Sequence, residues 1–433
     1  MTAMRLKRPK RRLLIIGLDG VPIELLREYT RDGTMPVLKE LLSHCPPVAM
    51  TASLPEISAV SWSGFMTGMD SGDHGIFGFT DLEDNSYRLR FPDFRDLRRK
   101  PFFMMGGKPS VIINLPATYP ARPMRGALIS GFVAPDLERA VWPPDLYPRV
   151  RDSGYVIDLE CSRVQEEPEV FFSNLHTVLR HRLDLAVNLM RDLEWETFMF
   201  TVTGTDRLHH FFFDAWNRDD HPRHKEFRDY YVELDASLGE LLEEARRCIH
   251  PEWLILSDHG FAPLKTEINL NPLLREWGYA EKEVPDPEGI TVPVRKSRVF
   301  ALDPSRIYIH SKERYPEGRV APAERKRILE EMIPRFASIR HENRPVIRSV
   351  HRREDIYARP YRHLAPDLVL EAEPGFDLKA GFSKSSVFCK GKFRGSHQRD
   401  NAFLACSMPE FMPRNPSIFQ VRDLVDKMLK QRT

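Results

Sequence analysis

The chain has 433 residues, of which 42% are hydrophobic and 29% are charged, and its formal net charge is +2. This length and composition allow a sizeable core and exclude an intrinsically disordered protein. The near-neutral charge gives no reason to expect binding to nucleic acid or to an anionic membrane, although residues 5–12 form a short basic arm. No apolar run reaches the roughly 18 residues that a membrane span requires.

The five cysteines are scattered along the chain and form no CxxC pair. Such a set is typical of reduced thiols in a cytoplasmic protein, so we expect a cytoplasmic location. The sequence leaves the oligomeric state open.

Strand and helix patterns alternate from the start of the chain. Apolar runs bounded by turn residues predict buried strands at 13–18, 109–116, 126–132, 195–206 and 252–258. Apolar residues spaced three and four apart predict helices at 23–29, 36–43, 171–193 and 227–242. This order is typical of an α/β fold with a mostly parallel central sheet and helices on both faces.

The pattern loosens after Phe261 into a stretch rich in proline and charge. A helix is predicted near 323–333, and the strand pattern at 367–372 predicts a return to the core. We therefore expect an inserted, smaller α+β cap at residues 265–363. The catalytic core would comprise residues 1–264 and 364–433.

The first predicted strand ends in a carboxylate. Asp19 follows the run Leu13–Leu18, which places it at the carboxyl edge of the predicted sheet, where open α/β sheets bind ligands. It also precedes a predicted helix, and aspartate is a favourable N-cap residue. From this stretch alone, both interpretations are open.

Acidic residues and histidines follow other core elements in the same way. Asp206 and His210 are four residues apart, so a helix that begins at Asp206 would place both on one face, close enough to bind one divalent metal. Asp258 and His259 are consecutive at the end of a strand, and His397 follows a glycine turn. Taken singly, each has an ordinary explanation as a helix cap or as a structural or solvated histidine.

Taken together, these positions supply three carboxylates and three imidazoles at the edges of core elements. Such a set suits zinc, manganese or iron, and it does not suit calcium, which prefers oxygen ligands alone. The sequence therefore predicts a site for two metal ions. The residues are Asp19, Asp206, His210, Asp258, His259 and His397.

Longer stretches of the sequence resemble one family. The runs "IGLDG", "ASLPEISAVSWSGFMTGMDSGDHGIFGF", "TDRLHHFF", "ILSDHGF" and "RGSHQRDNAFLA" are similar to the type I phosphodiesterase/nucleotide pyrophosphatase family of the alkaline phosphatase superfamily. The resemblance covers nearly all of the chain. It implies an alkaline phosphatase-like fold and two divalent metal ions bridged by a serine or threonine nucleophile, with zinc expected and manganese or iron as alternatives.

The resemblance also assigns the ligands to the two ions. It implies one metal at Asp206, His210 and His397, and the other at Asp19, Asp258 and His259.

Ser58 is implied as the nucleophile, because it stands nine residues before the threonine of "TG", Thr67. It begins a stretch, residues 59–66, that can form a helix, and a helix N-terminus stabilises anions. Direct coordination to metal would favour the Ser58 alkoxide. Without the metal ligands, Ser58 would be interpreted as the N-cap of that helix.

The reaction implied by the resemblance is hydrolysis of a small phosphorylated substrate, most simply a phosphodiester or nucleotide, through a covalent phosphoserine. The alternatives are a phosphomonoesterase, a phosphonate hydrolase, or a phosphoryl transferase or mutase that uses the same site. A sulfatase would need a proline and an arginine after the nucleophile, and "SAVSW" has neither.

Some positions depart from the family pattern or fall outside it. Ser61 stands where the nucleotide pyrophosphatases have an asparagine, so nucleotide specificity is in doubt, although Ser61 could donate one hydrogen bond to substrate. His209 is expected beside the ligands or in solvent, and His74 is expected to be structural. In the predicted cap, cationic and aromatic residues are expected to contact substrate: Arg306, Tyr308, Lys312, Arg314 and Tyr315.

Overall fold

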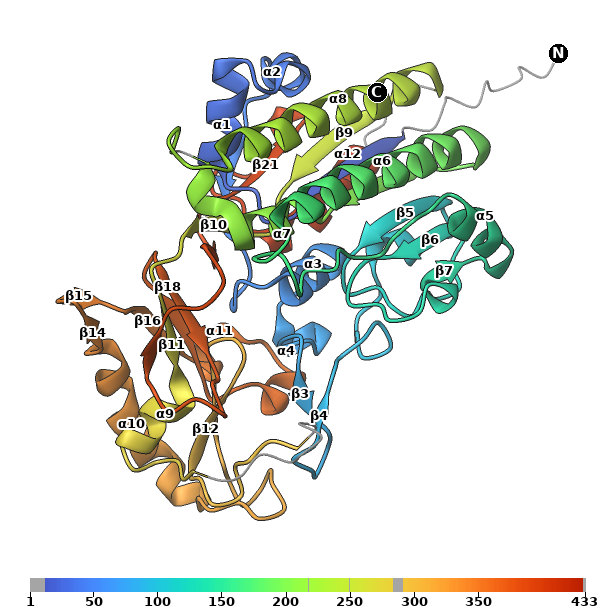
Figure 1. Cartoon of the computed structure of the whole chain (residues 1–433). Helices are drawn as coiled ribbons and strands as arrows, with labels where there is room; N and C mark the ends of the chain where they lie inside the picture. Colours follow the sequence, from blue (N-terminus) through green and yellow to red (C-terminus); the bar gives the residue numbers. More distant parts are fainter. Residues whose placement is uncertain (1–11, 217, 249, 283–290, 431–433) are drawn as a thin grey trace.

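An eight-stranded sheet forms the centre of the computed structural model, which describes residues 12–216, 218–248, 250–282 and 291–430 (Figure 1). Residues 5–11 of the basic arm lie outside the described part. The strand order is β2-β21-β9-β1-β8-β5-β6-β7. The pairs from β9 to β6 are parallel, and the pairs β2–β21, β21–β9 and β6–β7 are antiparallel. The predicted mostly parallel sheet is thus confirmed. Its strands are β1 Leu13–Leu18, β2 Val48–Met50, β5 Ser110–Leu115, β6 Gly126–Ser130, β7 Val141–Trp142, β8 Thr197–Val202, β9 Glu252–Leu256 and β21 Ala402–Cys406.

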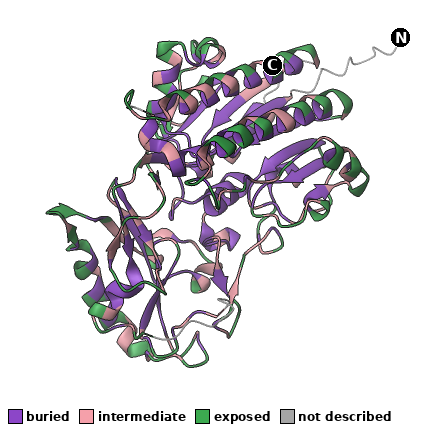
Figure 2. Ribbon diagram, in the orientation of Figure 1, coloured by how far each residue is buried: buried purple, intermediate pink, exposed green. Residues whose placement is uncertain are grey.

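Helices cover both faces of this sheet because side chains alternate along each buried strand. In β1, Leu14 and Ile16 pack against α1, α2, α6 and α8, whereas Leu13 and Ile15 pack against α3 and α12. Figure 2 shows the strands buried and the outer faces of α6 and α8 exposed. These helices are α1 Ile23–Asp32, α2 Pro36–Leu42, α3 Ser58–Thr67, α6 Pro168–Asp192, α8 His224–Cys248 and α12 Val421–Lys430.

Smaller sheets pack beside the carboxyl edge of the central sheet (Figure 1). One has the order β12-β13-β17-β16, another has the order β18-β11-β19, and β10 pairs with β20. Their strands are β10 Gly260–Pro263, β11 Thr266–Asn269, β12 Val299–Leu302, β13 Arg306–Ile309, β16 Ile347–Arg352, β17 Leu368–Ala372, β18 Phe376–Lys379, β19 Phe388–Cys389 and β20 Gly395–Gln398. The remaining helices and strands include α4 Ser71–His74, α5 Tyr147–Asp152, α7 Gly204–Phe212, α9 Leu270–Glu276, α10 Pro322–Ala337, α11 Arg353–Ile356, β3 Asp81–Leu82, β4 Leu89–Arg90, β14 Arg340–His341 and β15 Arg344–Pro345.

The prediction that the strand at 367–372 returns to the core was wrong. This strand, β17, pairs with β13 and β16 in the four-stranded sheet. A short buried apolar run has the same pattern in either sheet, and only its distant partners decide where it pairs. The chain rejoins the central sheet later, at β21.

No helix in the described ranges combines the length and the apolar character that crossing a membrane requires. All five cysteines are free.

Candidate metal centre and active site

Three neighbouring parallel strands bring the predicted ligands to one edge of the sheet. Asp19 follows β1, and Asp258 and His259 follow β9. The prediction that the strand before Asp206 extends to this residue was wrong, because β8 ends at Val202 and Asp206 lies in the first turn of α7. Since β9, β1 and β8 are adjacent and parallel, their carboxyl ends meet at the same place.

Asp19, Asp258 and His259 form a fully buried cluster whose ligand atoms lie within 4.8 Å of one another. The Nε2 atom of His259 is 3.5 Å from Asp19 Oδ1 and 3.5 Å from Asp258 Oδ2. Asp19 does not cap α1, because Pro22 is the N-cap residue there and no side chain caps the helix. The capping alternative for Asp19 therefore does not hold.

Asp206, His210 and His397 form a second cluster beside the first. The Nε2 atoms of His210 and His397 are 3.0 Å apart, and they lie 3.4 Å and 3.3 Å from Asp206 Oδ1. Ligand atoms bound tetrahedrally to a zinc ion would be separated by about 3.3 Å. His259 Nε2 is 4.0 Å from Asp206 Oδ1, so His259 lies between the two clusters.

The donor atoms suit a divalent cation. Within the described part of the chain, Asp206 Oδ1 and Asp258 Oδ2 are buried and have no hydrogen-bond partner, which a bound cation would supply. His259 Nδ1 and His397 Nδ1 lie 3.1 Å and 2.8 Å from the carbonyl oxygens of Gly260 and Glu56, so each Nδ1 carries the proton that it donates. This tautomer directs the Nε2 lone pair toward the cluster.

The charges of the site also favour cations. Burial, followed by the neighbouring carboxylates of Asp258 and Asp206, raises the pKa of Asp19 well above its ordinary value. Burial likewise raises the pKa of Asp258 to about 7. Burial opposes ionisation of Asp206 too, but His210, His397 and Arg207 hold its pKa well below the ordinary value. Divalent cations would remove the repulsion among these buried carboxylates.

Ser58 lies at the start of α3 and touches the first cluster. Its Oγ donates to Asp19 Oδ1 at 3.2 Å and is 3.1 Å from His259 Nε2. The N-cap residue of α3 is Ile57, so the hydroxyl of Ser58 does not cap the helix. The structure thus places the predicted nucleophile among the predicted ligands.

Sequence comparison decides the family. Residues 13–400 match the family "Type I phosphodiesterase / nucleotide pyrophosphatase". The chain belongs to this family. The resemblance stated from the sequence is thereby confirmed. Membership of this family makes the protein a phosphoester hydrolase by class. A sequence search of curated proteins gives no match.

Solved structures share the fold over nearly the whole chain. Phosphonoacetate hydrolase from Sinorhizobium meliloti 1021, in complex with phosphonoformate, is 16% identical, with a TM-score of 0.67 and coverage of 97% of this chain and 96% of that chain. Human ectonucleotide pyrophosphatase / phosphodiesterase 5 is 13% identical, with a TM-score of 0.58 and coverage of 98% and 96%. The murine protein in an inactive form with AMP is 13% identical, with a TM-score of 0.57 and the same coverage.

Trp62 is a site residue of this phosphodiesterase family member that the sequence analysis missed. It lies four residues after Ser58, on the same face of α3, and its Nε1 donates to Asp19 Oδ2 at 3.0 Å. This bond fixes the orientation of the carboxylate whose other oxygen accepts from Ser58. The spacing of Ser58 and Trp62 on a predicted helix was the signal that could have identified it.

Ser61 and two histidines near the site make buried contacts within the protein. The Ser61 hydroxyl is buried 2.8 Å from the Ser53 hydroxyl, so its contacts do not support the predicted bond to substrate. His209 is buried, with Nδ1 donating to the Gly20 carbonyl and Nε2 accepting from Tyr231 Oη, which leaves no nitrogen for a metal. His74 is fully buried, and burial lowers its pKa to about 3, as suits a structural residue.

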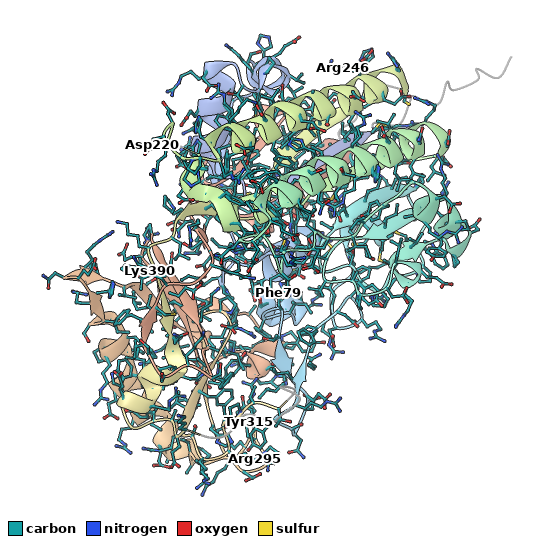
Figure 3. All side chains as sticks on the ribbon, in the orientation of Figure 1. Phe79, Asp220, Arg246, Arg295, Tyr315 and Lys390 are labelled. Carbon is teal, nitrogen blue, oxygen red and sulfur yellow. The ribbon has the colours of Figure 1, made fainter. Side chains whose placement is uncertain are left out.

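A cavity of about 490 Å³ opens beside the second cluster. His210 and His397 form part of its wall, together with Phe79, which Figure 3 labels between the central sheet and the smaller sheets. The smaller sheets supply the opposite wall through residues 303–305 and 376–379. Of these cavity-lining residues, the sequence analysis identified only the two histidines.

Arg306 and Tyr308 do not line this cavity, and the prediction that they contact substrate does not fit their positions. Arg306 is fully buried, and its guanidinium donates to the carbonyl of Asp303, to Tyr308 Oη and to Thr80 Oγ1. The sequence shows an arginine and a tyrosine two residues apart. It does not show that both side chains of β13 are buried in the protein interior.

Arg306→Ala is therefore expected to lower the free energy of unfolding by about 2–4 kcal/mol, because buried hydrogen-bond partners would be left unsatisfied. Lys312→Ala, at an exposed position close by, should change it by less than about 0.5 kcal/mol. Urea unfolding of the two variants measures the difference. A raised KM in Arg306→Ala with unchanged stability would instead restore the original prediction.

Proposed function

We propose that this protein is a two-metal phosphoric ester hydrolase with Ser58 as the nucleophile. One ion would be held by Asp206, His210 and His397, and the other by Asp19, Asp258 and His259. The nitrogen and oxygen donors suit zinc, with manganese or iron as alternatives. The observation that carries the proposal is the contact of Ser58 Oγ with both Asp19 and His259.

The chemistry follows from the position of Ser58. Its oxygen lies 3.2 Å from Asp19 Oδ1 and 3.1 Å from His259 Nε2, so an ion held by these residues would favour loss of the hydroxyl proton to solvent. The serine oxygen attacks phosphorus and the bond to the leaving oxygen breaks, and that oxygen takes up a proton from solvent and departs as an alcohol. Water then hydrolyses the phosphoserine. Bound divalent ions would stabilise the negative charge on the serine oxygen and on the phosphoryl group. The N-terminus of α3 adds a favourable dipole at the same point.

Residues of the smaller sheets would hold the organic part of the substrate. We keep residues 265–363 as a substrate-binding subdomain in this proposal, and we extend it through β17 to β20, because 376–379 also line the cavity. Family membership favours a phosphodiester or nucleotide substrate. The phosphonoacetate hydrolase structure is a complex with phosphonoformate and the murine structure is a complex with AMP, so phosphonates and phosphomonoesters stay as alternatives.

A substrate panel tests the proposal. Metal-free protein should be inactive towards chromogenic phosphodiesters, phosphomonoesters and phosphonates, and added zinc or manganese should restore hydrolysis of at least one class. Elemental analysis of the active form should give about two transition-metal ions per chain. Activity of protein shown to contain no such metal would overturn the two-metal assignment.

A further inference from the structure

Two lysines of the smaller sheets lie against one aromatic ring in the wall of the cavity. The ammonium groups of Lys379, in β18, and Lys392, in the loop before β20, lie 5.4 Å and 5.7 Å from the ring centre of Phe393. All three residues line the cavity of about 490 Å³. Lys392 is exposed at its mouth, and its ammonium also lies 5.5 Å from the ring centre of Phe211.

This group of residues is fixed to the proposed metal centre. The ring centre of Phe393 is 4.7 Å from that of His210, and the backbone N–H of Arg394 donates to the His210 carbonyl at 2.7 Å. This hydrogen bond anchors the loop that carries Lys392 at Arg394, the residue after Phe393. Phe393 thus contacts both lysines and a proposed metal ligand.

The two lysines differ in how their charges are compensated. Lys379 is paired with Asp377 at 2.6 Å. Arg207, the other cation in this wall, is paired with Asp158 and Asp206. Among the residues that the structure describes, no carboxylate oxygen lies within 4.0 Å of the Lys392 ammonium. Glu160 attracts Lys392 electrostatically without forming an ion pair, so within the described residues the Lys392 ammonium can still pair directly with an anion in the cavity.

We propose that Lys392, supported by Lys379, binds a second anionic group on the organic part of the substrate, an inference that rests on the proposed function. The substrate would carry a carboxylate or another phosphate besides the phosphoryl group that reacts. Phe211, Phe376 and Leu378 also line the cavity, so an apolar or aromatic spacer would join the two anions. Lys392 would act on substrate selection and not on bond cleavage.

Binding of benzylphosphonates, whose C–P bond has no adjacent carbonyl group to activate it, tests this inference directly. Calorimetry would compare benzylphosphonate with its 4-carboxy and 4-(2-carboxyethyl) derivatives on the zinc-loaded protein. At least one carboxylated probe should bind roughly five- to tenfold more tightly than the parent compound, as expected for a charged contact near the surface. This advantage should shrink at high salt, because salt screens exposed charges.

Variants of the loop separate recognition from folding. Lys392→Gln should remove the advantage of the carboxylated probe and leave binding of benzylphosphonate within about twofold. Lys392→Arg should retain the advantage, because the charge is kept. Lys390→Gln is the matched control, since Lys390 is exposed in the same loop and Figure 3 shows it on the outer flank, away from Phe79.

The outcomes distinguish this inference from the proposed reaction. If no carboxylated probe binds more tightly than its parent, or if Lys392→Gln weakens all probes equally, the inference is overturned. If hydrolysis proceeds without any preference for a second anion, the inference fails and the reaction stands. If the carboxylated probe binds through Lys392 but no phosphoester is hydrolysed, the recognition stands and the reaction fails.

Discussion

Ser58→Ala is expected to lower kcat by at least roughly 10³-fold, because it removes the attacking oxygen and leaves all six proposed metal ligands in place. Metal content and the thermal midpoint should stay near the wild-type values, since the hydroxyl does not cap α3. Steady-state kinetics and elemental analysis of the same sample measure both. Mass spectrometry of acid-quenched wild-type protein should detect phosphate on the peptide that contains Ser58.

Ser63→Ala provides a matched control for this variant. Ser63 is buried in the same helix, but its hydroxyl donates to the Ala59 carbonyl at 2.7 Å and does not touch the proposed ligands. Its removal should leave kcat within a few-fold of wild type. If Ser58→Ala retained a tenth of the activity or more, a water molecule and not Ser58 would be the attacking group.

The sequence was sufficient to predict where the proposed ligands would meet because the relevant strands are mostly apolar runs. Such runs identify buried parallel strands, and parallel neighbours place their carboxyl ends together. Asp19 and Asp258 could therefore be assigned to one edge of a sheet before any contact was known. Asp206 was assigned correctly to that edge even though its strand ends earlier than predicted, at Val202.

Residues whose roles depend on contacts between distant segments could not be predicted in the same way. Lys379 lies in β18 and Lys392 in the loop before β20, and both lie against the ring of Phe393 only in the folded chain. Arg306 carries the charge of an anion-binding residue, yet its hydrogen bonds hold the turn at 303–305. Side-chain direction in these segments is set by tertiary pairing, which one sequence does not specify.

Asp206 is the carboxylate of the second cluster, and it lies close to histidines of both clusters. Its Oδ1 lies within 4.0 Å of the Nε2 atoms of His210, His397 and His259. Asn is isosteric with Asp but neutral, so Asp206→Asn preserves the volume of the buried side chain and removes the charge that attracts a cation. The fold should survive, because α7 and β8 keep their packing.

Asp206→Asn is expected to reduce the metal content from about two ions per chain to about one, and to lower kcat/KM by at least roughly 10³-fold. Zinc should raise the thermal midpoint of this variant less than that of wild type, since an ion that binds more weakly stabilises the folded protein less.

Asp235→Asn is the control, because Asp235 is equally buried but accepts hydrogen bonds from the backbone of Val37 and Leu38, remote from the site. That variant should lose stability and keep both ions. Two bound ions and full activity in Asp206→Asn would remove Asp206 from the metal centre, and the unpartnered oxygen at 206 would then need another explanation.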